Sequence, residues 1–230
     1  MRNKFVVIKK KCLFIALAVL LIIPLLWGLF YAKGASIPKP EYTIVIDAGH
    51  GGRDGGAVGK VTGITESELN LKYAKCLENL CKDFGISVVM TRKDMNGLYD
   101  ENASNKKRSE MEKRKKIIND SGADLMISLH MNSFPLESCE GAYVFYAKGS
   151  EEGFKLAKGV QNSLSQSFEN ARDYVTVGDY FVLNYSIVPS ILIECGFLSN
   201  PTEEMRLVSN EYCENFCYSI LAGVLSYFQM

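Results

Sequence analysis

Residues 44–56 of this 230-residue chain read IVIDAGHGGRDGG: an apolar β-branched run, an acid, and then a histidine among five glycines. The run predicts a buried strand that ends in a glycine-rich turn. Two phosphate-binding interpretations of this loop fail at one position. The dinucleotide pattern G-x-G-x-x-G and the P-loop pattern G-x-x-x-x-G-K-[ST] both need a glycine where Asp54 stands. The loop also holds His50, one of only two histidines in the chain, which favours a metal site.

Strand-length apolar runs alternate with helix-length amphipathic segments from Tyr42 to the carboxyl end. The runs are 42–47, 86–91, 123–130, 141–146, 179–184 and 190–195, and the helical segments lie in 69–84, 104–120, 151–168 and 203–228. Strands that alternate with helices predict α/β layers around a largely parallel sheet. Apolar residues make up 47% of the chain, enough to fill the core of one such domain.

The amino-terminal segment predicts a membrane anchor. Residues 1–12 carry five positive charges, and residues 13–32 are uncharged and almost wholly apolar. About 20 apolar residues suffice for a helix to cross a bilayer, and preceding positive charges keep the amino end in the cytoplasm. Residues 32–35 match a signal-peptide cleavage site poorly, which favours a retained signal-anchor. Residues 33–41 are then predicted to be a linker and residues 42–230 a domain. If the segment is cleaved, the protein is secreted.

Charge and cysteine content narrow the functional classes. A formal net charge of zero and a pI near 6.7 argue against a nucleic-acid partner. The basic clusters 106–108 and 113–116 are interpreted as a solvated helix face. The seven cysteines contain no C-x-x-C, which excludes a zinc ribbon or a redox motif of that kind. Four of them fall in helical segments, where small buried apolar residues are the expected role and a disulfide stays open: Cys76, Cys81, Cys213 and Cys217.

The two histidines fall at equivalent places in the predicted fold. His50 follows the first strand and His130 closes the run 123–130, and the carboxyl ends of parallel strands meet at one edge of a sheet. Two histidines and one glutamate are a standard catalytic zinc set. Glu66 and Glu68 both stand at a predicted helix start, and a capping box from Thr65 would turn Glu68 back to the backbone. Glu66 is then free to point off the helix end as a candidate third ligand, but on local grounds alone a favourable contact with the helix dipole is the better explanation of its position.

Glu194 lies within the apolar run ILIECGF. A carboxylate there is costly unless it is paired or functional, so it is the candidate base for the attacking water, with a buried arginine or lysine partner as the alternative. Cys195 beside it is a weaker candidate nucleophile, because its base would have to be one of the two histidines.

Five ordered stretches resemble the zinc-dependent N-acetylmuramoyl-L-alanine amidases of the Amidase_3 family. They are IVIDAGHGGRDGGAVG, GITESELNLKYA, VVMTRKD, ADLMISLHMNS and PSILIECGFLSNPTE. The resemblance implies a single twisted six-stranded sheet flanked by helices, with one Zn²⁺ held by His50, Glu66 and His130, and Glu194 as the catalytic residue. Arg92 and Arg114 match family arginines with structural or substrate-side roles. Asp173 departs from the family pattern, since many members have glycine at this position. The departure concerns the shape of the local loop and not the chemistry.

A short domain behind one anchor is most similar to the CwlD-type sporulation and germination amidases. This resemblance implies hydrolysis of the bond between the lactyl group of N-acetylmuramic acid and L-alanine in peptidoglycan of the spore cortex, before muramic δ-lactam forms. It further implies a membrane-anchored enzyme whose catalytic domain faces outward, in the forespore intermembrane space, and an accessory lipoprotein activator. Asp47, Asn132 or nearby carbonyl groups are expected to orient the imidazoles. The alternatives are another exported zinc hydrolase (a peptidase or deacetylase), a silent wall-binding domain, or a nucleotide-binding domain.

Overall fold

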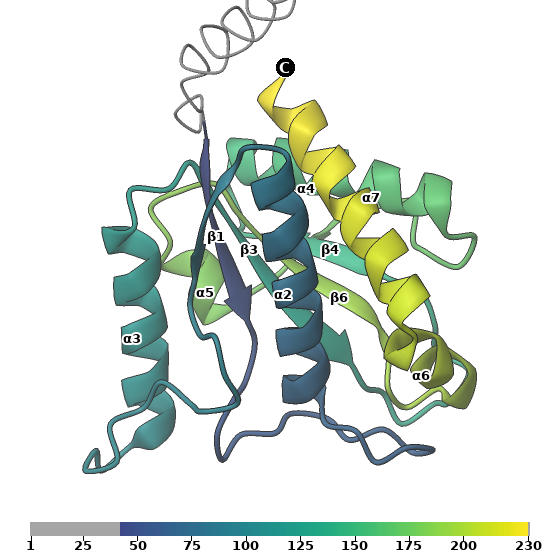
Figure 1. Ribbon diagram of the computed structural model, residues 1–230, viewed down its shortest axis with the longest axis horizontal. Coiled ribbons are helices and arrows are strands. Elements are labelled where there is room, and N and C mark those ends of the chain that lie inside the picture. The colour runs from purple at the N-terminus through teal and green to yellow at the C-terminus, as the bar shows by residue number, and fades with distance from the viewer. Residues whose placement is uncertain (1–41, 230) are drawn as a thin grey trace, which may run out of the picture. The chain divides into compact units, whose positions relative to one another are not determined.

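A six-stranded sheet in the order β2-β1-β3-β6-β4-β5 forms the centre of the computed structural model, which describes residues 42–229 (Figure 1). Its strands are β1 (Thr43–Ala48), β2 (Ser87–Met90), β3 (Leu125–Asn132), β4 (Tyr143–Tyr146), β5 (Thr176–Val177) and β6 (Ser190–Phe197). The helices are α2 (Glu66–Asp83), α3 (Lys106–Asp120), α4 (Glu151–Ser167), α5 (Phe181–Asn184), α6 (Pro201–Val208) and α7 (Asn210–Phe228). Strands β2, β1, β3 and β6 pair in parallel, whereas β4 runs antiparallel to β6. The predicted α/β fold with a largely parallel six-stranded sheet is confirmed.

Alternation along the buried strands divides the core between the two faces of the sheet. Ile44 and Ile46 of β1 pack in the larger cluster with residues of α2, α4 and α7. Val45, which points the opposite way, packs in the smaller cluster with Ile118 of α3 and Val182 of α5. Helices α2 and α7 therefore lie in front of the sheet in Figure 1, with α3 and α5 on the other face.

One predicted strand is wrong. Residues 179–184 were expected to be extended, but Phe181–Asn184 form helix α5, and the edge strand β5 is the two-residue pair Thr176–Val177. Val182 and Leu183 are adjacent and both buried in the smaller cluster, whereas a strand would direct them to opposite faces. A short apolar run does not by itself distinguish these two structures.

The predicted carboxyl-terminal helical segment is two helices rather than one. Asn200 caps α6 with Pro201 in its first turn, and α6 ends at Val208. Ser209 is extended, with φ −64° and ψ 139°, and its side chain accepts a hydrogen bond from the backbone of Tyr212 to cap α7. The serine thus stops one helix and starts the next.

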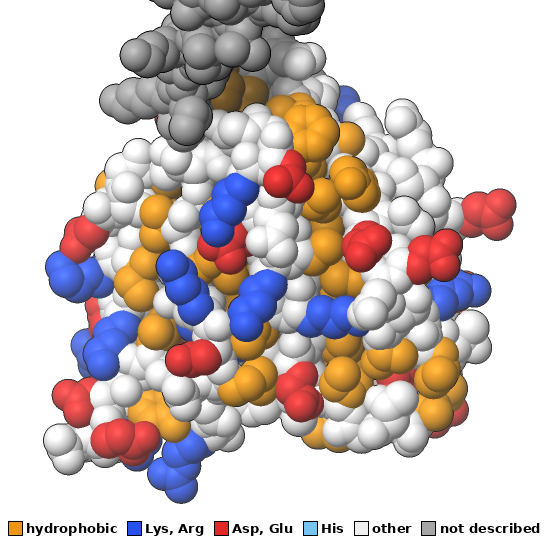
Figure 2. All heavy atoms as spheres, in the orientation of Figure 1, with side chains coloured by type: hydrophobic (Ala, Val, Ile, Leu, Met, Phe, Trp, Pro, Cys, Tyr) orange, Lys and Arg blue, Asp and Glu red, His pale blue; other side chains and the backbone are white. Residues whose placement is uncertain are grey.

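The predicted cytoplasmic end, anchor and linker (1–12, 13–32 and 33–41) lie outside the described residues. Among residues 42–229, no helix has the length and apolar character that crossing a bilayer requires. Acidic and basic side chains are interspersed over the face in Figure 2, with apolar side chains between them. Arg114 is an exception to the predicted solvated face of α3, since it is only 1% exposed.

Candidate active site

The candidate site lies where three neighbouring strands of the sheet end. β1, β3 and β6 are adjacent, and His130 of β3 is directly opposite Glu194 of β6 in the parallel register. His50 follows β1 by two residues. The two strand ends predicted to carry histidines therefore meet, and the strand that carries Glu194 lies beside them.

The turn that presents His50 is held in an unusual conformation. His50 has φ 60°, the left-handed region that residues other than glycine rarely adopt. Its carbonyl oxygen accepts a hydrogen bond from Arg114, which also donates to the carbonyl of Ala48 at 2.8 Å. Arg92 donates to the carbonyls of Ala48 and Gly49, both at 2.9 Å. Both arginines thus support the loop backbone, which assigns them a structural role.

Asp47 pairs with Arg114 and so stabilises the buried arginine that supports this loop. Its carboxylate is 1% exposed, pairs with Arg114, and accepts hydrogen bonds from Thr91 and Ser128, both at 2.7 Å. Burial alone would favour the neutral acid, but the charge of Arg114 and the two hydroxyl groups hold the pKa of Asp47 below its ordinary value.

Glu66 enters the site because the capping box occupies Glu68. Thr65 is the N-cap of α2, its side chain accepts from the backbone of Glu68, and the Glu68 carboxylate accepts from the backbone of Thr65 at 2.8 Å. The capping box is confirmed, and it leaves the 5%-exposed Glu66 turned inward. Oε2 of Glu66 accepts a hydrogen bond from the backbone of Ala57 at 2.9 Å.

Two glycines provide the space for these side chains. A Cβ atom on Gly49 would lie 2.3 Å from Nε2 of His130, and one on Gly56 would lie 2.4 Å from Oε2 of Glu66. Gly56 also has φ +68°. The glycines of the opening stretch therefore allow the loop backbone to approach both side chains closely.

Nitrogen atoms of both histidines converge on one carboxylate oxygen. Oε1 of Glu66 is 2.8 Å from Nδ1 of His130 and 3.0 Å from Nε2 of His50, and the two imidazole rings have centroids 5.0 Å apart. Burial opposes ionisation of Glu66, yet hydrogen bonds with His130 and His50 keep its pKa far below the ordinary value. Burial likewise opposes a charged His50, but its pKa is raised because Glu66 and Asp54 lie beside it.

Glu194 has no such partner. It is 8% exposed, and its buried Oε2 makes no hydrogen bond with the described residues 42–229. Burial raises the pKa of Glu194 to about 7, with the Glu66 carboxylate adding to the rise and the histidines opposing it. The predicted alternative, a partner for a buried arginine or lysine, is wrong for the described residues. A carboxyl group with a pKa near neutrality is suited to take up and release a proton.

The donor set fits a metal ion. Two imidazole nitrogens and one carboxylate oxygen lie within 4.8 Å of one another, and a cation there would replace the protons that now separate them. Beside this donor set, the buried Oε2 of Glu194 has no hydrogen-bond partner among residues 42–229, and Nδ1 of His50 lies 2.9 Å from Oδ1 of Asp54. Two histidines and one carboxylate are the ligand types that zinc takes in hydrolytic sites.

The site opens into a cavity of about 450 Å³. Its lining includes residues that the sequence analysis did not assign to the site: Lys107, Met111, Tyr180 and Phe181. The expected orienting residues differ from those observed. Asp47 bonds to Arg114 instead of an imidazole, Asn132 donates to the Tyr143 hydroxyl at 2.6 Å, and Asp54 approaches His50. In the sequence, the only indication that Asp54 would approach His50 is their separation by four residues.

The chain matches the sequence profile of Amidase_3, described as N-acetylmuramoyl-L-alanine amidase, over residues 44–226. This match covers well over half of the chain. The chain belongs to the N-acetylmuramoyl-L-alanine amidase family. The resemblance predicted from the five stretches is therefore confirmed.

Individual amidases are similar to this chain over most of its length. A germination-specific N-acetylmuramoyl-L-alanine amidase of Bacillus subtilis is 36% identical over 200 residues, which are 85% of this chain and 84% of that protein. The CwlD amidase of Clostridioides difficile, solved in complex with the GerS lipoprotein, superposes with a TM-score of 0.78 at 33% identity over 82% of this chain and 99% of that one. A second amidase structure, from Clostridium difficile 630, has a TM-score of 0.73 at 34% identity over 83% and 98%.

Proposed function

We propose that this amidase hydrolyses the bond between the lactyl group of N-acetylmuramic acid and L-alanine in peptidoglycan, with one Zn²⁺ per chain. The observation that carries the proposal is the convergence of His50, Glu66 and His130 beside a buried, unpaired Glu194 in one cavity. Membership of the family supports the substrate class, and the donor set supports the metal.

Three side chains would hold the zinc, each constrained by its surroundings. Arg114 holds the carbonyl group of His50, the capping box directs Glu66 inward, and β3 carries His130. Bound zinc would supply Lewis acidity to the scissile carbonyl and to the attacking water. Because the ligand positions are fixed by a buried arginine, a helix start and a central strand, little reorganisation is needed on binding.

Glu194 would carry the proton during the reaction. As a carboxylate it accepts a proton from the attacking water, and as the acid it donates that proton to the departing alanine nitrogen. Its burial in an apolar strand keeps the pKa near the pH at which both states are accessible. In this mechanism, Oε2, which makes no hydrogen bond with residues 42–229, is the atom available to accept the proton.

The substrate form proposed is spore cortex peptidoglycan, with release of peptide from muramic acid before δ-lactam formation. The similarity to a germination-specific amidase supports this choice. An accessory lipoprotein activator is proposed because the CwlD relative was solved with a lipoprotein. We further propose that residues 13–32 anchor the enzyme in the membrane with its catalytic domain, 42–230, outside the cytoplasm in the forespore intermembrane space.

Digestion of purified peptidoglycan tests the reaction. The complete zinc-loaded chain, with and without a soluble accessory lipoprotein, is incubated with vegetative sacculi and with cortex, and the products are analysed as muropeptides. New L-alanine amino ends that appear only with metal, and mainly from cortex, support the proposal. Released acetate would indicate a deacetylase, and new ends within the peptide would indicate a peptidase. Binding without any product would indicate a wall-binding domain.

A further inference from the structure

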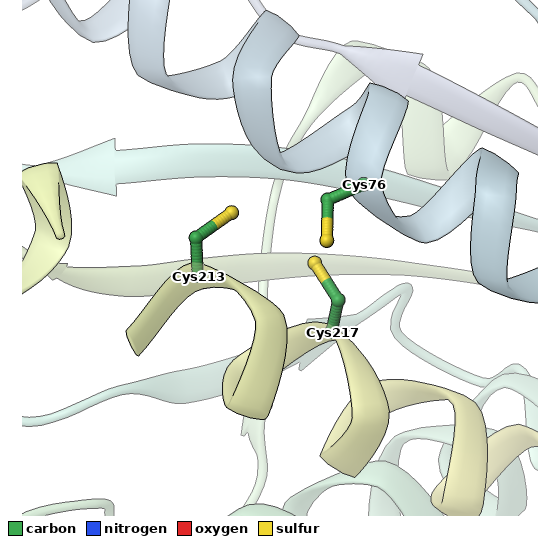
Figure 3. Close-up of side chains that lie close together, drawn as sticks. All are labelled: Cys76, Cys213 and Cys217. Carbon is green, nitrogen blue, oxygen red and sulfur yellow. The ribbon is translucent and has the colours of Figure 1, made fainter. Parts of the chain in front are cut away.

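Three cysteines from different parts of the chain gather between α2 and α7. Cys76 comes from α2, and Cys213 and Cys217 come from α7 (Figure 3). Their Sγ atoms lie within 4.8 Å of one another. The sequence predicted separate, small buried side chains at these positions, but the packing of α2 against α7 brings the three thiols to one point.

The spacing of these thiols suits a shared cation and excludes a disulfide between Cys213 and Cys217. Cys213 and Cys217 are four residues apart on one helix, so their Cβ atoms are about 5–6 Å apart, beyond the roughly 3.5–4.5 Å of a disulfide. Three sulfurs around one metal, each at about 2.3 Å, are roughly 4 Å from one another. The observed limit of 4.8 Å is close to that spacing, so a small inward rotation of the side chains would suffice.

The surroundings favour a thiolate at Cys76 alone. Hydrogen bonds from Cys213 and Cys217 lower the pKa of Cys76, and the nearby charge of Lys72 lowers it further. Despite a hydrogen bond with Cys217, the hydrogen bond with Cys76 and burial raise the pKa of Cys213 to about 12. Burial raises the pKa of Cys217, so these two thiols would lose their protons only when a cation binds. The Cys217 thiol lies 3.4 Å from the carbonyl oxygen of Tyr73, which holds it toward α2. Cys76 is half-buried whereas Cys213 and Cys217 are buried, so a cation would enter past Cys76.

We propose that Cys76, Cys213 and Cys217 form a second metal site, which binds one thiophilic d¹⁰ cation such as Zn²⁺ or Cu⁺. Soft thiolate ligands select this class of metal. Each thiol that ligates gives its proton to solvent, and no ligand is oxidised or reduced. The site is structural, because it joins α2 to α7 and its ligands stand apart from the amidase centre. Cys76 is ten positions beyond Glu66 on α2, roughly 15 Å of helical rise.

Titration of the complete, reduced chain with Cd²⁺ tests the second site. Cadmium is a d¹⁰ thiophilic probe, and its bonds to thiolates give an ultraviolet charge-transfer band that histidine and carboxylate ligands do not give. We expect this band to saturate at one Cd²⁺ per chain, with protection of three thiols from alkylation. His130→Ala should keep the band, since His130 belongs to the amidase centre. At free Cd²⁺ about 100 times its Kd, the folded-to-unfolded ratio should rise about 100-fold.

Cysteine variants make the test specific. Cys76→Ser and Cys217→Ser should weaken Cd²⁺ binding by more than the ~10–100-fold expected from loss of a supporting contact. Cys139→Ser is the matched control, since Cys139 is half-buried and outside the cluster, and it should bind as the parent does. Alanine variants at Cys76 and Cys217, each checked for folding by circular dichroism, show whether weaker binding comes from a lost ligand or from misfolding.

Two results would overturn the second site. The first is a band that is absent, or that survives both Cys76→Ser and Cys217→Ser in folded protein. The second is a disulfide from Cys76 to either partner in the isolated chain, with no Cd²⁺ uptake after reduction.

Discussion

Replacing Glu194 by glutamine should make the metal-free protein more stable at alkaline pH while removing the proposed catalytic proton carrier. Burial raises the pKa of Glu194 from 4.5 to about 7. The folded state therefore holds this proton more tightly than the unfolded chain. As pH rises from about 4.5 to 7, the unfolded chain releases the proton first, and the free energy of unfolding falls. Above about pH 7 the loss is complete.

The size of the effect follows from the shift. Each pKa unit corresponds to about 1.4 kcal/mol, so the Glu194 carboxylate costs about 3 kcal/mol at pH 8 relative to pH 4. Glutamine has the same shape and does not titrate. The difference in free energy of unfolding between the variant and the parent should therefore change by about 3 kcal/mol between these pH values, in favour of the variant at pH 8. A cation bound beside Glu194 would reduce this difference, because it stabilises the carboxylate.

Urea unfolding measures this difference directly. Residues 42–229 lie within one compact unit. Circular dichroism of the parent and the variant at pH 4 and pH 8, in the presence of a chelator, gives the four free energies of unfolding that are needed. Glu137→Gln is the control, because the Glu137 side chain is 60% exposed and surface changes usually stay within about 0.5 kcal/mol. The reasoning about Glu194 is refuted if its variant and the parent differ by the same amount at both pH values, or if the parent gains on the variant toward pH 8.

Three further predictions concern the loop, the buried arginine and the metal. Gly56→Ala should abolish zinc binding, because its Cβ would lie 2.4 Å from Glu66 Oε2, whereas Gly63→Ala, at φ +74° in open space, should cost only about 1–2 kcal/mol in unfolding experiments. Arg114→Met should cost about 3–5 kcal/mol by leaving Asp47 unpaired. The exposed Lys116→Met control should cost under about 1 kcal/mol. Zinc at 100 times its Kd should stabilise the chain by about 2.7 kcal/mol in calorimetry. Zinc uptake should weaken as the pH falls through the pKa of His50, which Glu66 and Asp54 hold above its ordinary value, because a protonated imidazole cannot bind a cation. Equal zinc affinity in both glycine variants, a mild Arg114 effect, or uptake unchanged at pH 4 would each contradict the corresponding reasoning.

Local patterns predicted much of the candidate site. The strand ends predicted that His50 and His130 meet. The capping box favoured Glu66 over Glu68, and the family resemblance then selected Glu66 as the ligand. The apolar surroundings of Glu194 also stood in the sequence, and the buried, unpaired carboxyl group agrees with that pattern.

Features that depend on contacts between distant elements were not predictable in the same way. Arg114 lies in a basic stretch typical of a solvated helix, and only the packing of α3 shows that it is buried against Asp47. The segment 179–184 has the apolar content of a strand, but burial of two adjacent residues on one side made it a helix. The three-cysteine cluster joins positions more than a hundred residues apart, and no short motif marks it.

The most direct test of the central claim compares the parent chain with Glu194→Gln on the same peptidoglycan. Both proteins are loaded with zinc, their zinc content is measured, and the new L-alanine amino ends are counted. We expect equal zinc in both proteins, and a rate of L-alanine end release at least about 100-fold lower for the variant than for the parent. If the variant releases these ends at the parent's rate, or the parent's activity is unchanged after its zinc is removed, the assignment of zinc and Glu194 to the reaction is contradicted.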